Sequence, residues 1–169
     1  AKQAGAIISY DPNLRISLWP SAEAARDGML SGLAGADFLK VSSEELEFML
    51  GVSSIHEGIQ RLRERGVGLI AVTLGPRGCI LADANTTVEH AGFRVEVVDT
   101  TGAGDGFVAA ILDELVRARR TAPLGDLSGA ELTQLARFAN AVGALTTTQK
   151  GAIPALPTRD AAESFLARH

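Results

Sequence analysis

The regular alternation of short apolar runs with longer segments of helical periodicity most constrains the fold of this chain. Three five-residue runs, at 6–10, 37–41 and 69–73, are largely apolar and end at polar or turn residues. Strands that alternate with helices are typical of a layered protein built on a parallel sheet. The sequence therefore predicts an α/β fold with a mostly parallel sheet.

Serine and threonine residues mark where the helices between these strands begin. Ser21 is expected to cap a helix that runs to about Leu30, and the pair at 42–43 opens a helix that ends at Leu50 before Gly51. Further helices are predicted at 55–65, with Ile59 and Leu62 inward, at 105–119, at 129–148, and from Thr158 to the C-terminus.

Two stretches depart from this alternation. Between 79 and 98 the short segments CILAD (79–83), TTVEH (86–90) and VEVV (95–98) predict an antiparallel extension at one edge of the sheet. Residues 1–4 resemble the tail of a helix closed by Gly5, and the sequence does not begin with Met. We expect the sequence to be a piece of something longer.

Composition limits the classes of partner. The chain has 169 residues, 46% of them hydrophobic, and a net charge of −4 with neither sign gathered into a block. This pattern argues against nucleic acid and against an anionic membrane surface, and it favours a small-molecule partner. Cys79 is the single cysteine, which fits a reducing compartment. No apolar run approaches the roughly 20 residues of a membrane helix. The cytoplasm is therefore the expected location.

The stretch DTTGAGDG at 99–106 has the strongest chemical signal. Gly102, Ala103 and Gly104 carry little or no side chain and lie where a helix begins, so successive backbone N–H groups can converge on one point. Such a helix N-terminus attracts an anion, a phosphate in particular. The stretch is therefore a candidate anion hole for a phosphoryl group.

Asp105 stands out beside this anion hole, because a carboxylate repels a bound phosphate. That placement makes sense if Asp105 accepts the proton of a nucleophile that attacks the phosphate. The alternative is an acidic residue of the first helical turn, stabilised there by the helix dipole. The spacing alone leaves both interpretations open.

Three other loops carry residues of interest, each with a structural alternative. In TLGPRG at 73–78 the glycines allow the backbone to approach a ligand closely, and Arg77 could bind a phosphate. The structural alternative for this stretch is a strand-to-strand turn. Glu45 follows Ser42 by three residues, which is also the spacing of a capping box. DPNLR at 11–15 is an Asx/Pro turn from which Asn13 and Arg15 could point into a cleft.

Several other kinds of site are not supported. The sequence has no G-x-x-x-x-G-K-[ST] motif, and its 102–106 glycines read G-x-G-x-G, which is not the dinucleotide G-x-G-x-x-G. Its three histidines lack metal-ligand spacing, and no base lies near Cys79 in the sequence.

In order and content these stretches resemble the C-terminal, nucleotide-binding part of the PfkB/ribokinase family of carbohydrate kinases. DTTGAGDGFVAAIL is similar to the second signature of the family, TLGPRG to its nucleotide loop, and KGAIPALP at 150–157 to the segment that closes its active site. DPNLR with LWPSAEAARDGML, and KVSSEELEFMLG, resemble the fructokinase branch. The resemblance covers nearly all of residues 1–169 and implies a ribokinase-like three-layer α/β/α fold with a mostly parallel sheet and an antiparallel edge.

The resemblance implies an ATP-dependent sugar kinase, fructokinase-like, with ribokinase and 2-keto-3-deoxygluconate kinase as alternatives. Asp105 would deprotonate a primary hydroxyl of the sugar, and the amides of 102–105 would form the anion hole. Glu45 would help to place Mg²⁺ indirectly, although Ser42 replaces the asparagine of that family motif. Arg15 would reach toward the substrate or the phosphates. The positions implied for ATP are Thr73, Gly75, Arg77, Gly78, Gly104 and, near the adenine, Asn140.

Members of this family often hold a monovalent cation beside the anion hole. The corresponding residues here, mostly through backbone carbonyls, are Asp99, Thr101, Thr146, Gln149 and Gly151. Ala155 falls where ribokinase has a hydroxyl ligand, so K⁺ is an optional cofactor beside ATP and Mg²⁺.

The chain departs from the family most clearly in length. Family enzymes are about twice as long, and their N-terminal sugar-binding and lid part has no counterpart in this sequence. We therefore expect residues 1–169 alone to bind sugar poorly and to turn over slowly or not at all, because catalysis of phosphoryl transfer depends on positioning the acceptor. A non-catalytic nucleotide-binding fragment is the alternative of another class. The resemblance also allows a homodimer of the parent enzyme.

Overall fold

The computed structural model describes residues 2–121 and 123–169, so Ala1 of the predicted helix tail lies outside the described residues. The chain divides into two compact units. Unit 1 contains the chain up to Thr73 together with Leu81–Thr87 and Thr121–Leu127. Unit 2 contains Leu74–Ile80, Val88–Arg120 and Ser128–His169. Each unit is described by itself below.

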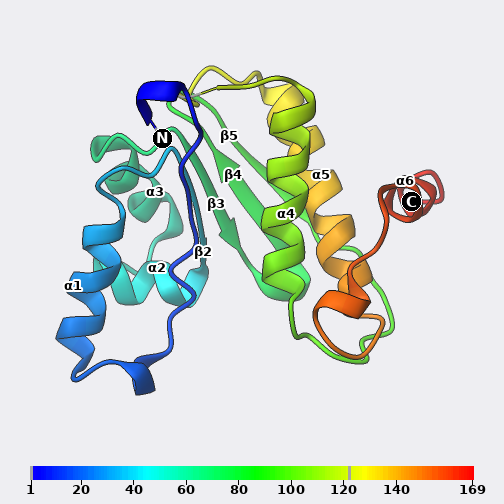
Figure 1. Ribbon diagram of the computed structural model, residues 1–169, viewed down its shortest axis with the longest axis horizontal. Coiled ribbons are helices and arrows are strands. Elements are labelled where there is room, and N and C mark those ends of the chain that lie inside the picture. The colour runs from blue at the N-terminus through cyan, green and yellow to red at the C-terminus, as the bar shows by residue number, and fades with distance from the viewer. Residues whose placement is uncertain (1, 122) are drawn as a thin grey trace. The chain divides into compact units, whose positions relative to one another are not determined.

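The strands form a five-stranded sheet in the order β1-β2-β3-β4-β5 (Figure 1). Their bounds are Ser9–Tyr10, Phe38–Ser42, Leu69–Thr73, Gly78–Ala82 and Thr87–Ala91. β1 pairs with β2 and β2 with β3 in parallel, with Lys40 opposite Ala71. β3, β4 and β5 follow one another through connections of four residues, which are too short for parallel crossovers, so the sheet is mixed. A parallel sheet with an antiparallel extension was predicted, and this is confirmed.

Two predicted strands differ from the structure. The strand expected at 6–10 is only two residues long, because the Asp37 carboxylate accepts the Ile8 N–H at 2.8 Å where a neighbouring strand would offer a carbonyl. The strand expected at 95–98 is absent. The Val98 N–H donates instead to the Thr147 carbonyl at 2.8 Å, and Val97 and Val98 are exposed.

Unit 1 contains the helices α1 (Ala22–Gly32), α2 (Ser43–Leu50) and α3 (Ile55–Glu64). The predicted caps are present: the Ser21 hydroxyl accepts the Ala24 N–H, and Gly51 ends α2 in the left-handed conformation. The core of this unit includes the fully buried side chains Phe38, Leu39, Leu46, Met49, Ile59, Leu62, Leu69 and Ile70. Each such side chain contributes roughly 1.5–3 kcal/mol when buried.

Unit 2 contains α4 (Ala103–Arg117), α5 (Gly129–Thr146) and α6 (Arg159–Leu166). α4 and α5 pack along each other, and α6 packs on α5 (Figure 1). Helix α4 begins two residues earlier than predicted, because Gly102 takes the N-cap position, and α5 ends two residues earlier than predicted. The threonine cap of α6 is confirmed, since the Thr158 hydroxyl accepts the Ala161 N–H at 3.2 Å.

Short 3₁₀ turns complete the chain: η1 (Lys2–Ala4), η2 (Ile16–Leu18), η3 (Gly75–Arg77) and η4 (Ile153–Ala155). The N-terminal segment predicted as a helix tail is thus a single 3₁₀ turn, and Gly5 follows it at φ +73°. No helix among residues 2–121 and 123–169 is long and apolar enough to cross a bilayer.

Candidate active site

The first turn of α4 presents unused backbone donors. Gly102 is the N-cap, at φ +80°, and Asp105 is the third helical residue. The Ala103 N–H donates to the Thr100 carbonyl at 3.2 Å, whereas the N–H groups of Gly104 and Asp105 have no acceptor in the described part of the chain. Free N–H groups at the positive end of a fifteen-residue helix bind anions. Of the amides expected to form the anion hole, that of Ala103 is therefore already engaged.

Close packing explains two of the glycines. A Cβ on Gly102 would lie 2.8 Å from the Ala152 Cβ and 2.9 Å from its Cα, and a Cβ on Gly106 would lie 2.8 Å from the Thr146 Oγ1. The loop before α4 therefore lies directly against residue 152, and α4 lies directly against the end of α5. Asp105 itself is exposed, at the surface of this turn.

Asp99 ties the loop before α4 to the loop after α5. Its Oδ1 accepts hydrogen bonds from the Thr101 hydroxyl (2.7 Å) and the Thr101 N–H (2.9 Å), and its Oδ2 accepts one from the Gly151 N–H (2.9 Å). The hydrogen bonds from the Thr101 hydroxyl and from the Gly151 and Thr101 amides lower the pKa of Asp99 to about 2. The carboxylate is thus held ionised and fixed in place.

The residues predicted for a monovalent cation lie in the same two loops of unit 2, except Thr146, which is the last residue of α5. The backbone carbonyls of Thr101, Thr146, Gln149 and Gly151 accept no hydrogen bond from the described residues. Neutral carbonyls beside an ionised carboxylate are the hard oxygen donors that an alkali cation takes. The chemistry of this donor set fits the cation. The described residues contain no cluster of three or more histidine, cysteine or acidic side chains that could hold another metal.

The nucleotide loop predicted at 73–78 is a tight turn. Gly75 and Gly78 have φ of +60° and +104°, and a Cβ on Gly78 would lie 2.1 Å from the His90 carbonyl oxygen. Arg77 is exposed, and its guanidinium has no partner among the described side chains. It is therefore available to a ligand. Thr73, the last residue of β3 in unit 1, donates its hydroxyl to the Val41 carbonyl at 3.4 Å.

Asn140 lies on α5 and is buried, with 8% of its surface exposed. Its amide nitrogen donates to the carbonyls of His90 (3.1 Å) and Ala91 (3.4 Å) on β5 and lies 3.2 Å from the His90 Nδ1. Burial raises the pKa of the Cys79 thiol on β4 to about 12, and a hydrogen bond with Asn140 opposes that shift. The side chain of Asn140 thus links α5 to two strands, and its predicted position near the adenine stays a prediction.

In unit 1, Glu45 joins the loops that follow β1 and β2. The predicted capping box is present: Oε2 accepts the Ser42 N–H at 2.8 Å, and the Ser42 hydroxyl accepts the Glu45 N–H. Oε1 accepts the N–H of Leu14 in the DPNLR turn at 2.8 Å. Arg15, in the same turn, is exposed and donates to the Asn13 Oδ1 at 2.7 Å.

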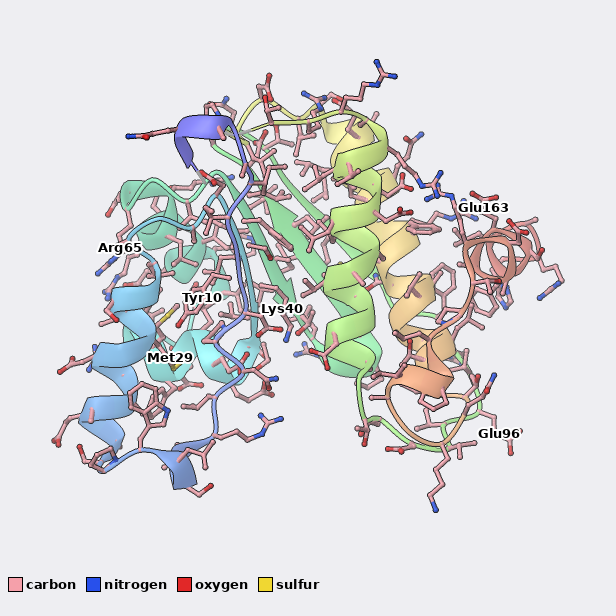
Figure 2. The ribbon with its side chains drawn as sticks, in the orientation of Figure 1. Tyr10, Met29, Lys40, Arg65, Glu96 and Glu163 are labelled. Atoms are coloured by element: carbon pink, nitrogen blue, oxygen red, sulfur yellow. The ribbon has the colours of Figure 1, made fainter. Side chains whose placement is uncertain are left out.

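Sequence reasoning missed Lys40, which lies in the middle of β2 and is 7% exposed (Figure 2). Its Nζ donates to the Asp11 Oδ2 at 3.1 Å. Burial raises the pKa of Asp11, while Lys40 opposes that shift. A lysine inside an otherwise apolar strand was the signal available in the sequence, because lysine is almost never buried without a partner.

Comparisons with known proteins identify the family of the chain. Residues 1–159 match the pfkB family of carbohydrate kinases. Fructokinase-1 of Zea mays is 46% identical over 159 residues, which are 94% of this chain and 48% of the maize protein. The chain thus spans about half the length of this relative.

Two solved structures are similar to the chain as well. The fructokinase of Vibrio cholerae O395, in a form with fructose, ADP and calcium bound, superposes with a TM-score of 0.86 at 38% identity, over 98% of this chain and 52% of that one. The fructokinase of Xylella fastidiosa with bound ATP superposes with a TM-score of 0.91 at 34% sequence identity, over 99% of this chain and 54% of that one. The mixed sheet and these similarities define a ribokinase-like α/β protein of the sugar-kinase class. The chain belongs to the PfkB family of carbohydrate kinases, which are enzymes.

Proposed function

We propose that this chain is the nucleotide-handling part of a fructokinase-like enzyme that transfers the γ-phosphoryl group of ATP to a primary hydroxyl of a sugar. The observation that carries the proposal is the first turn of α4. It combines two free backbone N–H groups, on Gly104 and Asp105, with an exposed carboxylate on the same turn. Free donors and an adjacent base are the two elements that phosphoryl transfer to a hydroxyl requires.

Asp105 serves as the general base in this proposal. Its carboxylate accepts the proton of the sugar hydroxyl as that oxygen attacks the γ-phosphorus, and the bond from this phosphorus to the bridging oxygen breaks, so that ADP leaves with the electron pair. The N–H groups of Gly104 and Asp105, with that of Gly102, donate to the phosphoryl oxygens on which charge gathers during transfer. Asp99 and the close contact of Gly102 with Ala152 keep these donors in position.

The proposed cofactors are ATP and Mg²⁺, with K⁺ optional. Gly75, Arg77 and Gly78 would lie along the nucleotide, with Arg77 donating to a phosphate. Both oxygens of Glu45 already accept backbone N–H groups, which leaves lone pairs for water molecules of a hydrated Mg²⁺ and fits the indirect role expected for this residue. Mg²⁺ would neutralise charge on the phosphates. The carbonyls of Thr146, Gln149 and Gly151 would hold K⁺ beside the anion hole.

Fructose is the proposed acceptor. The relative from maize is named a fructokinase, and the Vibrio cholerae structure contains fructose and ADP. Ribokinase and 2-keto-3-deoxygluconate kinase activities are the alternatives within the class. A coupled ADP-release assay of the full-length parent enzyme with fructose, ribose and 2-keto-3-deoxygluconate distinguishes them, and a preference for either of the last two would overturn the choice of fructose.

Asp105→Asn tests the proposed base, and Asp160→Asn is its matched control. Asp160 is also an exposed acid in the first turn of a helix, α6, so both variants lose the same favourable interaction with a helix dipole. In the full-length parent enzyme, we expect Asp105→Asn to bind ATP and to lose roughly a hundredfold to ten-thousandfold in kcat, the contribution of a general base. We expect Asp160→Asn to keep its turnover. Near-normal turnover in Asp105→Asn would remove that residue from the mechanism.

A second candidate function follows from the length of the match. Because the chain spans about half of its relatives, it could bind nucleotide without turning over. ATP binding with no sugar-dependent ADP release would support that alternative. Under either proposal the partners are small molecules, and the parent enzyme can form a homodimer. The proposed location is the cytoplasm, which accords with the single cysteine.

A further inference from the structure

The guanidinium group of Arg159 joins the three helices of unit 2. Arg159 is the first residue of α6, and its Nε donates to the Oε1 of Glu163 on the same helix at 2.7 Å (Figure 2). Its Nη1 and Nη2 donate to the Asp113 Oδ2 and the Glu114 Oε1 on α4, each at 2.6 Å. Its Cζ lies 4.8 Å from the centre of the Phe138 ring on α5. Three ion pairs that share one guanidinium form a network, because ordering a single side chain serves all three pairs.

The segment between α5 and α6, residues 147–158, lies against the first turn of α4, and we call it the strap (Figure 1). A Cβ on Gly102 would lie 2.8 Å from the Ala152 Cβ, and a Cβ on Gly106 would lie 3.2 Å from the Leu156 Cδ2. The strap therefore touches α4 at its N-cap and again at its fourth residue. These two contacts bracket the free backbone donors of the turn.

The strap has an anchor near each end. Near α5, the Thr147 carbonyl accepts the Asp99 N–H at 3.1 Å, and the Gly151 N–H donates to the Asp99 carboxylate at 2.9 Å. At the other end, the strap leads directly into Arg159. Between the anchors, Ile153 is 82% exposed, so burial of this side chain does not hold the strap in place. The position of the strap therefore depends on its two anchors.

Helix α4 connects the Arg159 anchor to the candidate anion hole. Asp113 lies ten residues after Ala103, where α4 begins, which is about 15 Å along a helix that rises about 1.5 Å per residue. The strap and α4 are thus joined at both ends of this length, and a segment closed at both ends has fewer conformations. If the start of α6 separated from α4, the strap would lose the anchor that limits how far Ala152 can move from Gly102.

We propose that Arg159 is a positioning residue for the anion hole. By clamping the start of α6 to α4, it keeps Ala152 against Gly102, so that the N–H groups of Gly104 and Asp105 stay directed at a bound phosphoryl group. The inference rests on the proposed function, and it adds a residue that acts through the strap and does not itself contact the ligand. Arginine suits this role because its planar fork can engage several carboxylates at once.

The test uses three variants of the full chain. Arg159→Leu removes the guanidinium and keeps an apolar side chain over Phe138. Arg117→Leu is the control, because Arg117 pairs with the same Asp113 carboxylate, at 2.8 Å, but lies on α4 and not beside the strap. Glu114→Gln weakens the clamp from the α4 side and leaves Arg159 in place, so it tests the same contact if Arg159→Leu folds poorly.

Two measurements separate positioning from general stabilisation. Amide hydrogen exchange of the unliganded chain, read at Gly151, reports how often the strap leaves Asp99. Calorimetric titration with ATP and with adenosine, in the presence of Mg²⁺, isolates the contribution of the phosphates, because adenosine has none. A residue that only stabilised the fold would change the Kd of both ligands alike.

An exposed ion pair is equivalent to at most about a fivefold change in an equilibrium constant, so loss of the two pairs with α4 should speed exchange at Gly151 by roughly tenfold. We expect Arg159→Leu also to raise the Kd for ATP by roughly tenfold, the equivalent of one hydrogen bond to a charged phosphate oxygen, and to leave adenosine unchanged. Arg117→Leu should change neither measurement. Glu114→Gln should change both in the same direction by a smaller factor.

Four outcomes would overturn the inference and leave the proposed function standing. They are an unchanged Kd for ATP in Arg159→Leu, an equal loss for ATP and adenosine, an equal loss of ATP affinity in Arg117→Leu, and unchanged exchange at Gly151. Absence of ATP binding by the unaltered chain would overturn both the inference and the proposed function.

Discussion

Gly102→Ala is the substitution that most directly tests how the first turn of α4 is built. Gly102 is the N-cap of α4 and has φ +80°, and a Cβ there would lie 2.8–2.9 Å from the Cβ and Cα of Ala152. An alanine must therefore adopt the left-handed conformation and also displace the loop after α5. Both effects act on the donors of Gly104 and Asp105.

The expected cost is the sum of two terms. A non-glycine residue in the left-handed region costs about 1–2 kcal/mol, and inserting a methyl group into a well-packed contact costs typically 1–3 kcal/mol. Gly66→Ala is the control: Gly66 has φ +82°, but a Cβ there would meet no atom within 4 Å. Only the backbone term applies at Gly66, so Gly102→Ala should be the more destabilising of the two by about 1–3 kcal/mol.

Urea denaturation followed by circular dichroism measures the free energy of unfolding of each variant. A parallel titration with MgATP should show weaker binding for Gly102→Ala and unchanged binding for Gly66→Ala. If Gly102→Ala costs no more than Gly66→Ala, the contact with Ala152 does not constrain this turn, and the argument for its packing fails.

Two further predictions concern unit 2. Asn140→Leu should destabilise the chain by roughly 1–3 kcal/mol, because leucine cannot replace the buried amide that donates to the carbonyls of His90 and Ala91; an unchanged thermal melting temperature would contradict the linking role of this amide. Asp99 has a pKa of about 2 in the folded chain, against a reference value of 3.8, so the folded chain binds this proton less readily than the unfolded chain does. Asp99 therefore contributes to the free energy of unfolding above about pH 4, and this contribution is lost as the pH falls toward 2. Urea midpoints between pH 6 and 2 should therefore fall less steeply in Asp99→Asn than in the unaltered chain, and parallel curves would refute this linkage.

Local signals in the sequence predicted most of the fold. Capping serines, the glycine after α2 and the apolar run of β3 each specify their element within a few residues, so these boundaries could be read directly. The short β1 could not, because its end depends on the side chain of Asp37, which is 29 residues away from Ile8. The missing strand at 95–98 has the same cause: the Val98 N–H pairs with Thr147 across a long separation in sequence.

The same distinction between local sequence signals and tertiary contacts applies to the candidate site. The glycines and the aspartate of the α4 turn are contiguous, so their pattern is visible in the sequence. The engagement of Ala103 by Thr100, the placement of Asn140 against β5 and the pairing of Lys40 with Asp11 depend on tertiary contacts. A lysine in a strand is ambiguous until its burial is known.

Calorimetric titration of this chain with MgATP, with and without fructose, tests the central claim most directly. The account predicts saturable binding of MgATP and little or no binding of fructose alone. Absence of any heat of binding with MgATP, from a chain shown to be folded by circular dichroism, would contradict the claim that these residues handle the nucleotide.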